Sequence, residues 1–374
     1  MDSPNRDKCI STLDSAISLL QSITLSSKSK PDLEFFKMYL RGHFATSFEQ
    51  SRAKESTVDS DFVRIGKEFH RWVSDNDKKL GLNTSKDYEE FINQIAYFAK
   101  IYHKLNELIA SRNTNDFLYL IVNSDFGFSL QPALLLSVIN YQDSQEIVEK
   151  KIALVSKYLT KVLAWRVWNH WVTSQSAMES RIYNLIQEIR GKSLEEISQI
   201  LTTYQIDGDI SIDTNTPSLN QQNRPKLRVL LALITEIIGR NSHESGYLLN
   251  ITDKKNPIEV EHIWSVNDEN KEKYEQEAGF QAVRKNIGGL LLLPKKFNAS
   301  YNDATYSTKV EQYFSQNILA QTLNPRKYEH SPGFVSFMND SNLEFKAYEV
   351  FDEKSINERA DLYRQVLKWN WEEK

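Results

Sequence analysis

The segments that decide the fold are PIEVEHIW at residues 257–264 and, after an acidic stretch, NIGGLLLLP at residues 286–294. Apolar and polar residues alternate in the first segment, which is the pattern of a half-buried strand. The second segment predicts a glycine turn and a short buried strand that ends at Pro294. Residues 303–320 then show apolar side chains at helical spacing, so the predicted order is strand, strand, helix.

The charge of the chain changes sign around these predicted strands. The formal net charge of the 374 residues is −4, which argues against a general polycation. Residues 265–277 are acidic, whereas the basic residues of 281–310 face only one acidic residue and are Arg284, Lys285, Lys295, Lys296 and Lys309. This reversal marks residues 281–310 as the region in which to look for a phosphate ligand.

The remainder of the chain predicts mostly helix. Apolar residues recur every three or four positions at 11–23, 32–44, 61–74, 88–105 and 147–172, which is typical of helices in a bundle. Residues 202–225 lose this periodicity, and an apolar helix follows at 227–238. We therefore expect a mainly α protein with a small α+β part, divided into a helical domain at 1–201, a linker at 202–225 and a second domain at 226–374 with its core at about 257–320.

Three tryptophans, Trp165, Trp168 and Trp171, follow each other at intervals of three residues. Exposed aromatic side chains can stack on nucleic-acid bases. An aromatic row at helical spacing more often belongs to a core, and we expect the core role here.

Length and composition limit the function classes further. A chain of 374 residues and 43.5 kDa predicts two or three domains. Its single cysteine, Cys9, excludes a disulfide framework and a Cys-rich zinc site, so any metal is expected to have oxygen and nitrogen ligands. Residues 126–142 are too short and interrupted for a membrane span, and the first residues lack a secretory pattern, so we expect a cytoplasmic protein.

The ordered motifs at the predicted strands match a known family. They are Glu261-His262-Ile263, Ile287-Gly288-Gly289-Leu290 with Leu293-Pro294, Asn298, and the pair Tyr306 and Lys309. This series resembles the HNH (His-Me finger) endonucleases, and looks closest to the nuclease half of GmrSD-type modification-dependent restriction systems. Residues 356–369 are similar to the closing helix of that nuclease half, and residues 35–40 and 63–72 resemble the helical segment of its fused members. The resemblance implies a C-terminal ββα-metal (HNH) nuclease domain.

The resemblance also implies a role for each motif residue. His262 is the expected general base, because a neutral imidazole with a pKa near 6.5 suits deprotonation of water. Glu261 and Asn298 are the expected catalytic metal ligands, and they would hold Mg²⁺, Mn²⁺ or another divalent cation. The expected DNA-binding residues are Lys309, Lys295, Lys296, Arg284 and Lys285, and the possible supporting residues are Asn286 and Asn302.

Two features of the sequence complicate this assignment. Glu261 and His262 are neighbours, and neighbours in a regular strand point to opposite faces, so the pair is expected where the strand ends or bulges. Most relatives have Asn where Gly289 stands, and they often have Pro where Ser265 stands. The missing Asn bears on how the imidazole is oriented, and Asn286 is a candidate substitute.

The expected activity is metal-dependent hydrolysis of DNA phosphodiester bonds in a restriction or antiviral defence system. No GxxxxGK[ST] motif occurs in the chain, so the resemblance points to a partner domain or subunit that hydrolyses NTPs. The alternative is a catalytically silent DNA-binding or scaffold subunit with the same fold. RNA is a third possible substrate. Each residue also has a structural alternative: Asn298 as a helix cap, the glycine pair as a hairpin turn, and the lysines as a solvated face.

Overall fold

The computed structural model describes residues 3–24, 29–48, 60–112, 114–208, 211–244, 251–266, 269–301 and 304–371. The chain divides into two compact units, one made of residues 1–160 and 173–209 and the other of residues 161–172 and 210–374. The fold is mainly α with one small two-stranded sheet in the second unit, as the sequence predicts. Within the described ranges, no helix combines the length and apolar character that crossing a membrane requires.

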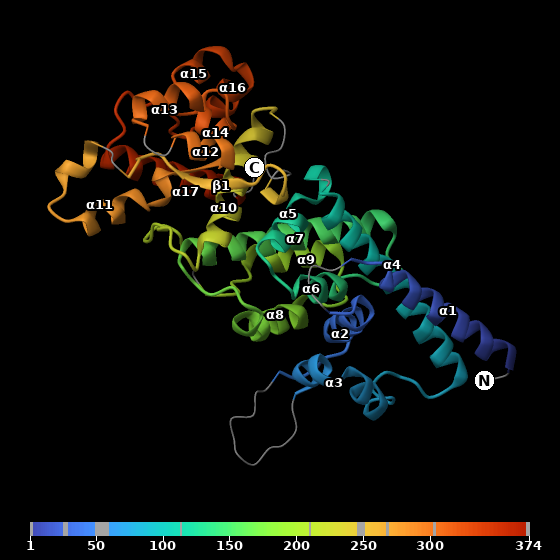
Figure 1. The fold of residues 1–374 in the computed structure, drawn as a ribbon. Coiled ribbons are helices and arrows are strands. Elements are labelled where there is room, and N and C mark those ends of the chain that lie inside the picture. The colour runs from blue at the N-terminus through green and yellow to red at the C-terminus, as the bar shows by residue number, and fades with distance from the viewer. Residues whose placement is uncertain are drawn as a thin grey trace. The chain divides into compact units, whose positions relative to one another are not determined.

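The first unit is built from helices only, among its described residues (Figure 1). They are α1 (Ser3–Gln21), α2 (Pro31–His43), α3 (Asp61–Asp75), α4 (Ser85–Ser111), α5 (Thr114–Asp125), α6 (Gln131–Ser137), α8 (Gln175–Ile189), α9 (Leu194–Thr203) and most of α7 (Gln145–Trp168). The last turns of α7 belong to the second unit. The helical periods predicted from the sequence fall on α1, α2, α3, α4 and α7.

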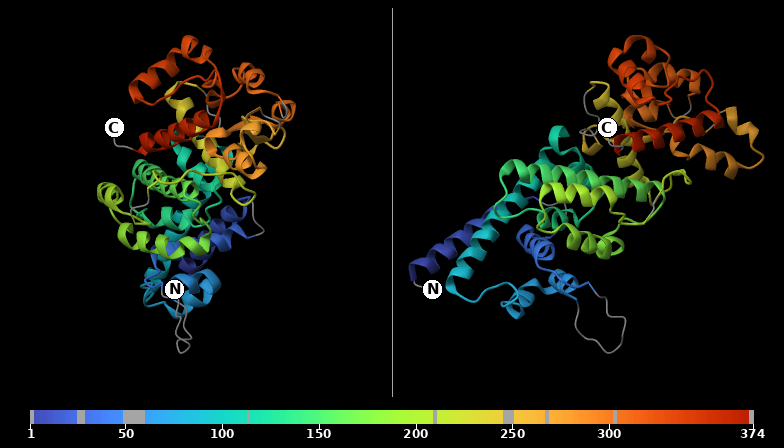
Figure 2. Two further views of the ribbon diagram at one scale, coloured as in Figure 1. Left: turned by 90° about the vertical axis from the view of Figure 1, so that its left-hand side faces the viewer. Right: turned by 180° about the vertical axis from the view of Figure 1, so that it is seen from behind.

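Local sequence explains the longest of these helices. The Thr84 hydroxyl oxygen accepts from the Asp87 backbone amide and the Asp87 carboxylate accepts from the Thr84 backbone amide, which forms a capping box at the start of α4. One face of α4 is buried through Ile95, Phe98 and Tyr102. In both Figure 1 and Figure 2, α1 lies side by side with α4, so each helix covers apolar surface of the other.

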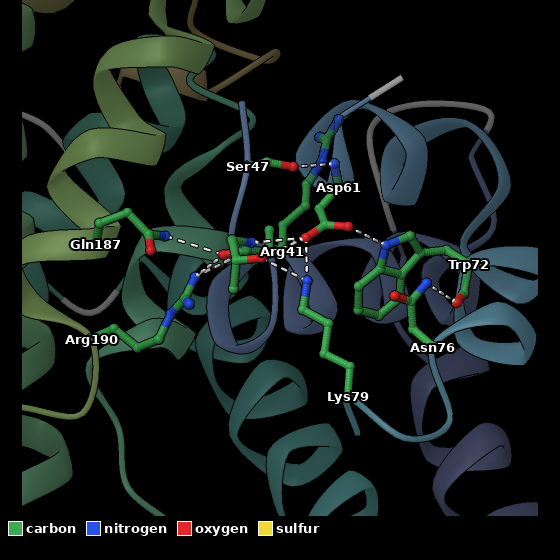
Figure 3. Close-up of polar contacts among 10 residues, drawn as sticks. Arg41, Ser47, Asp61, Trp72, Asn76, Lys79, Gln187 and Arg190 are labelled. Atoms are coloured by element: carbon green, nitrogen blue, oxygen red, sulfur yellow. Dashed lines mark hydrogen bonds and ion pairs between the residues drawn. The ribbon is translucent and has the colours of Figure 1, made fainter. Parts of the chain in front are cut away.

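A cluster of polar side chains around Asp61 stabilises the start of α3 (Figure 3). The Asp61 carboxylate accepts hydrogen bonds from the Trp72 indole at 2.8 Å and the Thr46 hydroxyl at 2.8 Å, and it pairs with Lys79. These partners lower the pKa of Asp61, although partial burial acts in the opposite direction. Nearby, Arg41 donates to the carbonyl oxygen of Phe62 at 2.9 Å. The cluster is therefore satisfied by its own members.

The second unit contains the sheet and the remaining helices. Its elements are α10 (Arg224–Asn241), β1 (Ile258–His262), η2 (Glu269–Lys273), α11 (Glu277–Arg284), η3 (Ile287–Gly289), β2 (Leu290–Pro294), α12 (Lys295–Tyr301), α13 (Tyr306–Tyr313), α14 (Ile318–Gln321), α15 (Arg326–His330), α16 (Pro332–Ser341) and α17 (Glu353–Trp371). β2 is apolar along its length and its first four residues are buried, which explains its uninterrupted run of leucines.

The two glycines before β2 form the 3₁₀ turn η3, which packs against α17. They are not a hairpin turn, because an acidic segment and α11 separate them from β1. A side chain on Gly288 would overlap the carbonyl oxygen of Ile356, whereas a Cβ on Gly289 would have its nearest contact at 3.4 Å, with the carbonyl oxygen of Arg284. Gly288 therefore lets the backbone of η3 approach α17 closely.

The helix predicted over residues 303–320 is interrupted. The structure has α13 and α14 there, and it adds α12 directly after β2. Asn298 lies inside α12, so it does not cap a following helix. Trp165 and Trp168 are buried, in agreement with the expected core role, whereas Trp171 is 43% exposed.

Candidate active site

The predicted metal ligand Glu261 and the predicted base His262 lie at the end of a regular strand. β1 and β2 are antiparallel, with Glu261 opposite Leu291 and His262 opposite Leu290. The pairing is continuous from Ile258 to His262, so β1 has no bulge. The pair was expected where the strand ends or bulges, and His262 is indeed the last residue of β1. Glu261 and His262 nevertheless remain neighbours in a paired strand, where successive side chains point to opposite faces.

Glu261 is buried and bound by other residues. Its Oε1 accepts a hydrogen bond from Lys309 Nζ at 2.7 Å and another from the Tyr313 hydroxyl at 3.1 Å. Burial and the neighbouring carboxylate raise the pKa of Tyr313 far above its usual value, so this hydroxyl stays a donor at neutral pH. The carboxylate charge is thus balanced within the protein.

Lys309 is placed differently from the expectation that it contacts DNA phosphates. Only 1% of its side chain is exposed, and its ammonium also donates to the carbonyl oxygens of His262 at 2.9 Å and Ile263 at 3.3 Å. An ammonium in this position ties α13 to the end of β1 and neutralises Glu261. The expectation of a surface role is wrong because the nearest anion is internal.

Asn298 contacts the preceding part of β1. Its Nδ2 lies 3.4 Å from the carbonyl oxygen of Val260 and 3.5 Å from the carboxylate of Glu259. Both contacts use the amide nitrogen, at the long limit of hydrogen-bond geometry. The structure therefore brings Asn298 to β1 through Glu259 and Val260, whereas within the described ranges no hydrogen bond joins it to Glu261 or His262.

The His262 ring has a nitrogen whose hydrogen-bonding capacity the described residues do not satisfy. Its Nε2 is inaccessible to solvent and has no hydrogen-bond partner among the described residues. Burial lowers the pKa of His262 to about 3, and the positive charges of Arg284, Arg224, Lys309 and Lys285 add to this effect. The imidazole is therefore neutral at pH 7 and has an unprotonated nitrogen.

Aromatic packing brings Arg284 to this end of the strand. Trp264, two residues after His262, stacks on Phe280 of α11 with ring centroids 5.6 Å apart. Arg284 ends α11 and donates from Nε to the carbonyl oxygen of Trp264 at 3.0 Å. Lys285 follows and is exposed. Two of the predicted DNA-binding residues thus contribute to the positive charge around His262.

Two further predicted DNA-binding lysines lie on α12. Lys295 is 64% exposed and pairs with Glu259 at 3.7 Å, and Lys296 is exposed with its ammonium 5.1 Å from the centre of the Phe297 ring. Their exposure is compatible with contact to a phosphate backbone.

Of the two possible supporting residues, Asn286 has other partners and Asn302 is not among the described residues. Asn286 accepts from the Gly288 backbone at 3.0 Å and donates to Asn357 at 3.4 Å, so its amide caps η3. In the part of the chain that the structure describes, no hydrogen bond joins Asn286 to His262. Asn302 lies outside the described residues.

Arg224 is a further basic residue near His262, and the sequence analysis did not single it out. It lies at the first position of α10, at the end of the segment assigned to the linker, and its charge contributes to the low pKa of His262. A signal was present, because a basic residue at a helix N-terminus opposes the helix dipole and calls for an explanation.

The residues present do not fit the predicted metal ion. Mg²⁺ needs oxygen ligands that are free to bind it. The Oε1 atom of buried Glu261 already accepts from the Lys309 ammonium, a positive charge that would repel a cation bound to the same carboxylate, and Asn298 contacts Glu259 and Val260 rather than Glu261. Within the described ranges, no three His, Cys, Asp or Glu side chains are grouped as metal ligands.

This second unit contains a nuclease domain of the restriction-endonuclease type. Residues 207–366 match the family model of the GmrSD restriction endonucleases, C-terminal domain. The match confirms the GmrSD-type resemblance noted in the sequence and includes every predicted site residue. No curated protein matches the chain.

Proposed function

We propose that residues 226–374 form an HNH-type endonuclease domain that hydrolyses DNA phosphodiester bonds, with residues 1–201 as a helical domain and 202–225 as the linker. The observation that carries this proposal is the His262 imidazole, whose buried Nε2 has no hydrogen-bond partner among the described residues. It is neutral at pH 7 and surrounded by positive charge, which suits it to an anionic substrate.

In the proposed reaction His262 accepts a proton from the water that attacks phosphorus. A bond forms between the water oxygen and phosphorus, the bond from phosphorus to the 3′ oxygen breaks, and the leaving oxygen takes a proton from solvent. A bound phosphate offsets the positive charges of Arg224 and Arg284, which raises the pKa of His262 from about 3 towards its usual value and makes it a stronger base.

The divalent cation implied by the family resemblance stays a prediction. Glu261 is engaged by Lys309 and Tyr313, so no step is assigned to a cation held by that carboxylate. The resemblance also implies an NTP-hydrolysing partner and a restriction or antiviral defence context. We propose both for this chain. A nuclease assay therefore has to compare reactions with and without Mg²⁺, with and without Mn²⁺, and with and without an NTP-hydrolysing partner.

A catalytically silent DNA-binding or scaffold subunit is the second candidate. The internal pairing of Glu261 with Lys309 favours it, because an ammonium already neutralises the charge of this carboxylate. The glycine at 289, where most relatives have Asn, favours it as well. This candidate predicts DNA binding without turnover.

The test is nicking of supercoiled plasmid by the full chain in Mg²⁺, Mn²⁺ or EDTA. We expect wild type to nick, and His262→Ala to reduce the rate by roughly 10²- to 10⁴-fold, as loss of a general base does. Binding of a DNA duplex by His262→Ala should stay within about twofold of wild type, since the substitution removes a neutral side chain. A matched RNA substrate identifies the preferred nucleic acid.

Two results would overturn the proposal. Equal nicking by wild type and His262→Ala would exclude His262 as the base. Equal binding by both proteins, with no nicking in any metal or partner condition, would establish the silent subunit instead.

A further inference from the structure

The end of the predicted linker is fixed beside the start of η3. The backbone amide of Leu219 donates to the carbonyl oxygen of Lys285 at 2.8 Å, and the amide of Ile287 donates to the carbonyl oxygen of Pro217 at 2.9 Å. Ser218 and Asn286 form an isolated antiparallel bridge between these two hydrogen bonds. Residues 217–219 therefore have a defined position against residues 285–287.

A compact turn then leads from this bridge to Arg224. Asn223 donates from Nδ2 to the carbonyl oxygen of Ser218 at 2.8 Å, and its Oδ1 accepts from the Asn220 backbone at 2.8 Å. Asn220 in turn accepts from the Asn223 backbone at 2.8 Å. These reciprocal bonds fix the backbone that leads from the bridge at Ser218 to Arg224, the first residue of α10.

A second arginine, Arg284 at the end of α11, lies near the end of β1. The bond from Arg284 Nε to the carbonyl oxygen of Trp264 places its guanidinium two residues beyond His262. Two separate segments thus bring cations to the end of β1. Arg224 and Lys285 are exposed, and within the described residues neither has an ion-pair partner. Lys295 and Lys309, in contrast, pair with Glu259 and Glu261.

We propose that Arg224, Arg284 and Lys285 form a phosphate-binding site beside His262, and that this site takes a backbone phosphate of DNA. The inference rests on the proposed function and adds Arg224 as a substrate-positioning residue from outside the strand–strand–helix motif. Like charges held together destabilise a surface unless an anion joins them. Guanidinium groups suit this ligand, because their donors match two phosphate oxygens at once.

The expected consequence is a phosphate close to the imidazole rather than a diffuse attraction to DNA. Arg224 and Arg284 approach from different segments, so a phosphate bound by both has a fixed position. The unpartnered Nε2 of His262 lies in the same neighbourhood. A site of this kind favours nucleic-acid backbones without reading their sequence.

The test is equilibrium binding of a labelled DNA duplex to the full chain in EDTA at several salt concentrations. The variants are Arg224→Gln, the charge-keeping Arg224→Lys, and Lys100→Gln as a control that removes one charge from an exposed position on α4 of the other unit. Circular dichroism checks that each variant is folded.

We expect Arg224→Gln to weaken binding roughly three- to tenfold near 0.1 M salt and to reduce the slope of log affinity against log salt by about one, the effect of losing one phosphate contact. Arg224→Lys should keep the slope, and Lys100→Gln should change neither quantity. Equal affinity and slope for Arg224→Gln and Lys100→Gln would overturn the inference, as would the absence of duplex binding by wild type. Because binding is measured without cleavage, this result is independent of whether His262→Ala still nicks.

Discussion

Each unit of the molecule holds a neutral imidazole whose Nε2 atom is buried, and the two imidazoles differ in their surroundings. Burial lowers the pKa of both His43 and His262 to about 3, and the Nε2 of each has no hydrogen-bond partner among the described residues. The ring of His43 lies against the rings of Phe98 at 4.4 Å and Tyr39 at 5.0 Å between centroids. His262 lies at a strand end among four cations.

This comparison shows that a lowered histidine pKa does not by itself identify a catalytic site. Arg190 is the one cation that contributes to the low pKa of His43, and aromatic side chains fill the space around its ring. At His262, Arg224, Arg284 and Lys285 add a positive field that an anionic substrate can satisfy. The surrounding charge, rather than the burial, distinguishes a candidate catalytic histidine from a core histidine.

The lysine–carboxylate pairs Lys309–Glu261 and Lys79–Asp61, one from each unit, differ in their burial, and this contrast gives the largest predicted effect on stability. Lys309→Met leaves Glu261 buried without its cation and should cost about 3–5 kcal/mol in free energy of unfolding. Lys79→Met removes the cation beside Asp61, a carboxylate that is more exposed than Glu261, and the Lys79 side chain is itself 32% exposed. The loss in free energy of unfolding should therefore stay below about 1 kcal/mol. Urea unfolding of both variants measures the difference.

The double variant Glu261→Gln with Lys309→Met serves as the control, since it removes both charges and should recover part of the loss. Equal costs for Lys309→Met and Lys79→Met would show that the Glu261 pair is not the buried ion pair described here.

A smaller effect is expected at the glycine pair of η3. Gly288→Ala places a Cβ against the backbone of α17 at Ile356 and should cost about 1–3 kcal/mol, as overpacking does. Gly289→Ala meets ordinary contacts and should cost less than about 1 kcal/mol. Thermal unfolding followed by circular dichroism compares the two. A larger loss from Gly289→Ala would contradict the packing of η3 on α17.

The smallest predicted effect is a pH dependence of the first unit. The folded pKa of His43 is about 3 and the unfolded pKa is near 6.5, so the unfolded chain binds more protons between these values. Stability is therefore lost as the pH falls below about 6.5, by about 1–2 kcal/mol at pH 5. His43→Phe should remove this part of the loss, which urea unfolding at pH 7 and pH 5 measures. An unchanged loss in the variant would argue against a neutral, buried His43.

The local patterns of the sequence predicted much of this fold. Alternation over residues 257–264 predicted β1, and the leucine run predicted β2, because side-chain period and burial determine strand formation locally. The apolar helix predicted at 227–238 lies within α10, which continues past Gly239 because one glycine costs a helix only about 1 kcal/mol.

Contacts between distant residues were not predictable in the same way. Lys309 and Glu261 are 48 positions apart, and a count of charges cannot show that one neutralises the other. Asn298 was expected near a metal, but α12 begins directly after Pro294 and brings its amide nitrogen to Val260. Arg224 was missed because its role depends on the bridge between Ser218 and Asn286.

The most direct test of the account compares the two histidines by plasmid nicking under single-turnover conditions. His262→Ala and His43→Leu are assayed beside wild type, with each rate divided by the folded fraction from circular dichroism. We predict a loss of at least about 10²-fold for His262→Ala and a rate within about twofold of wild type for His43→Leu. Equal rates for the two variants would contradict the assignment of His262 as the catalytic base.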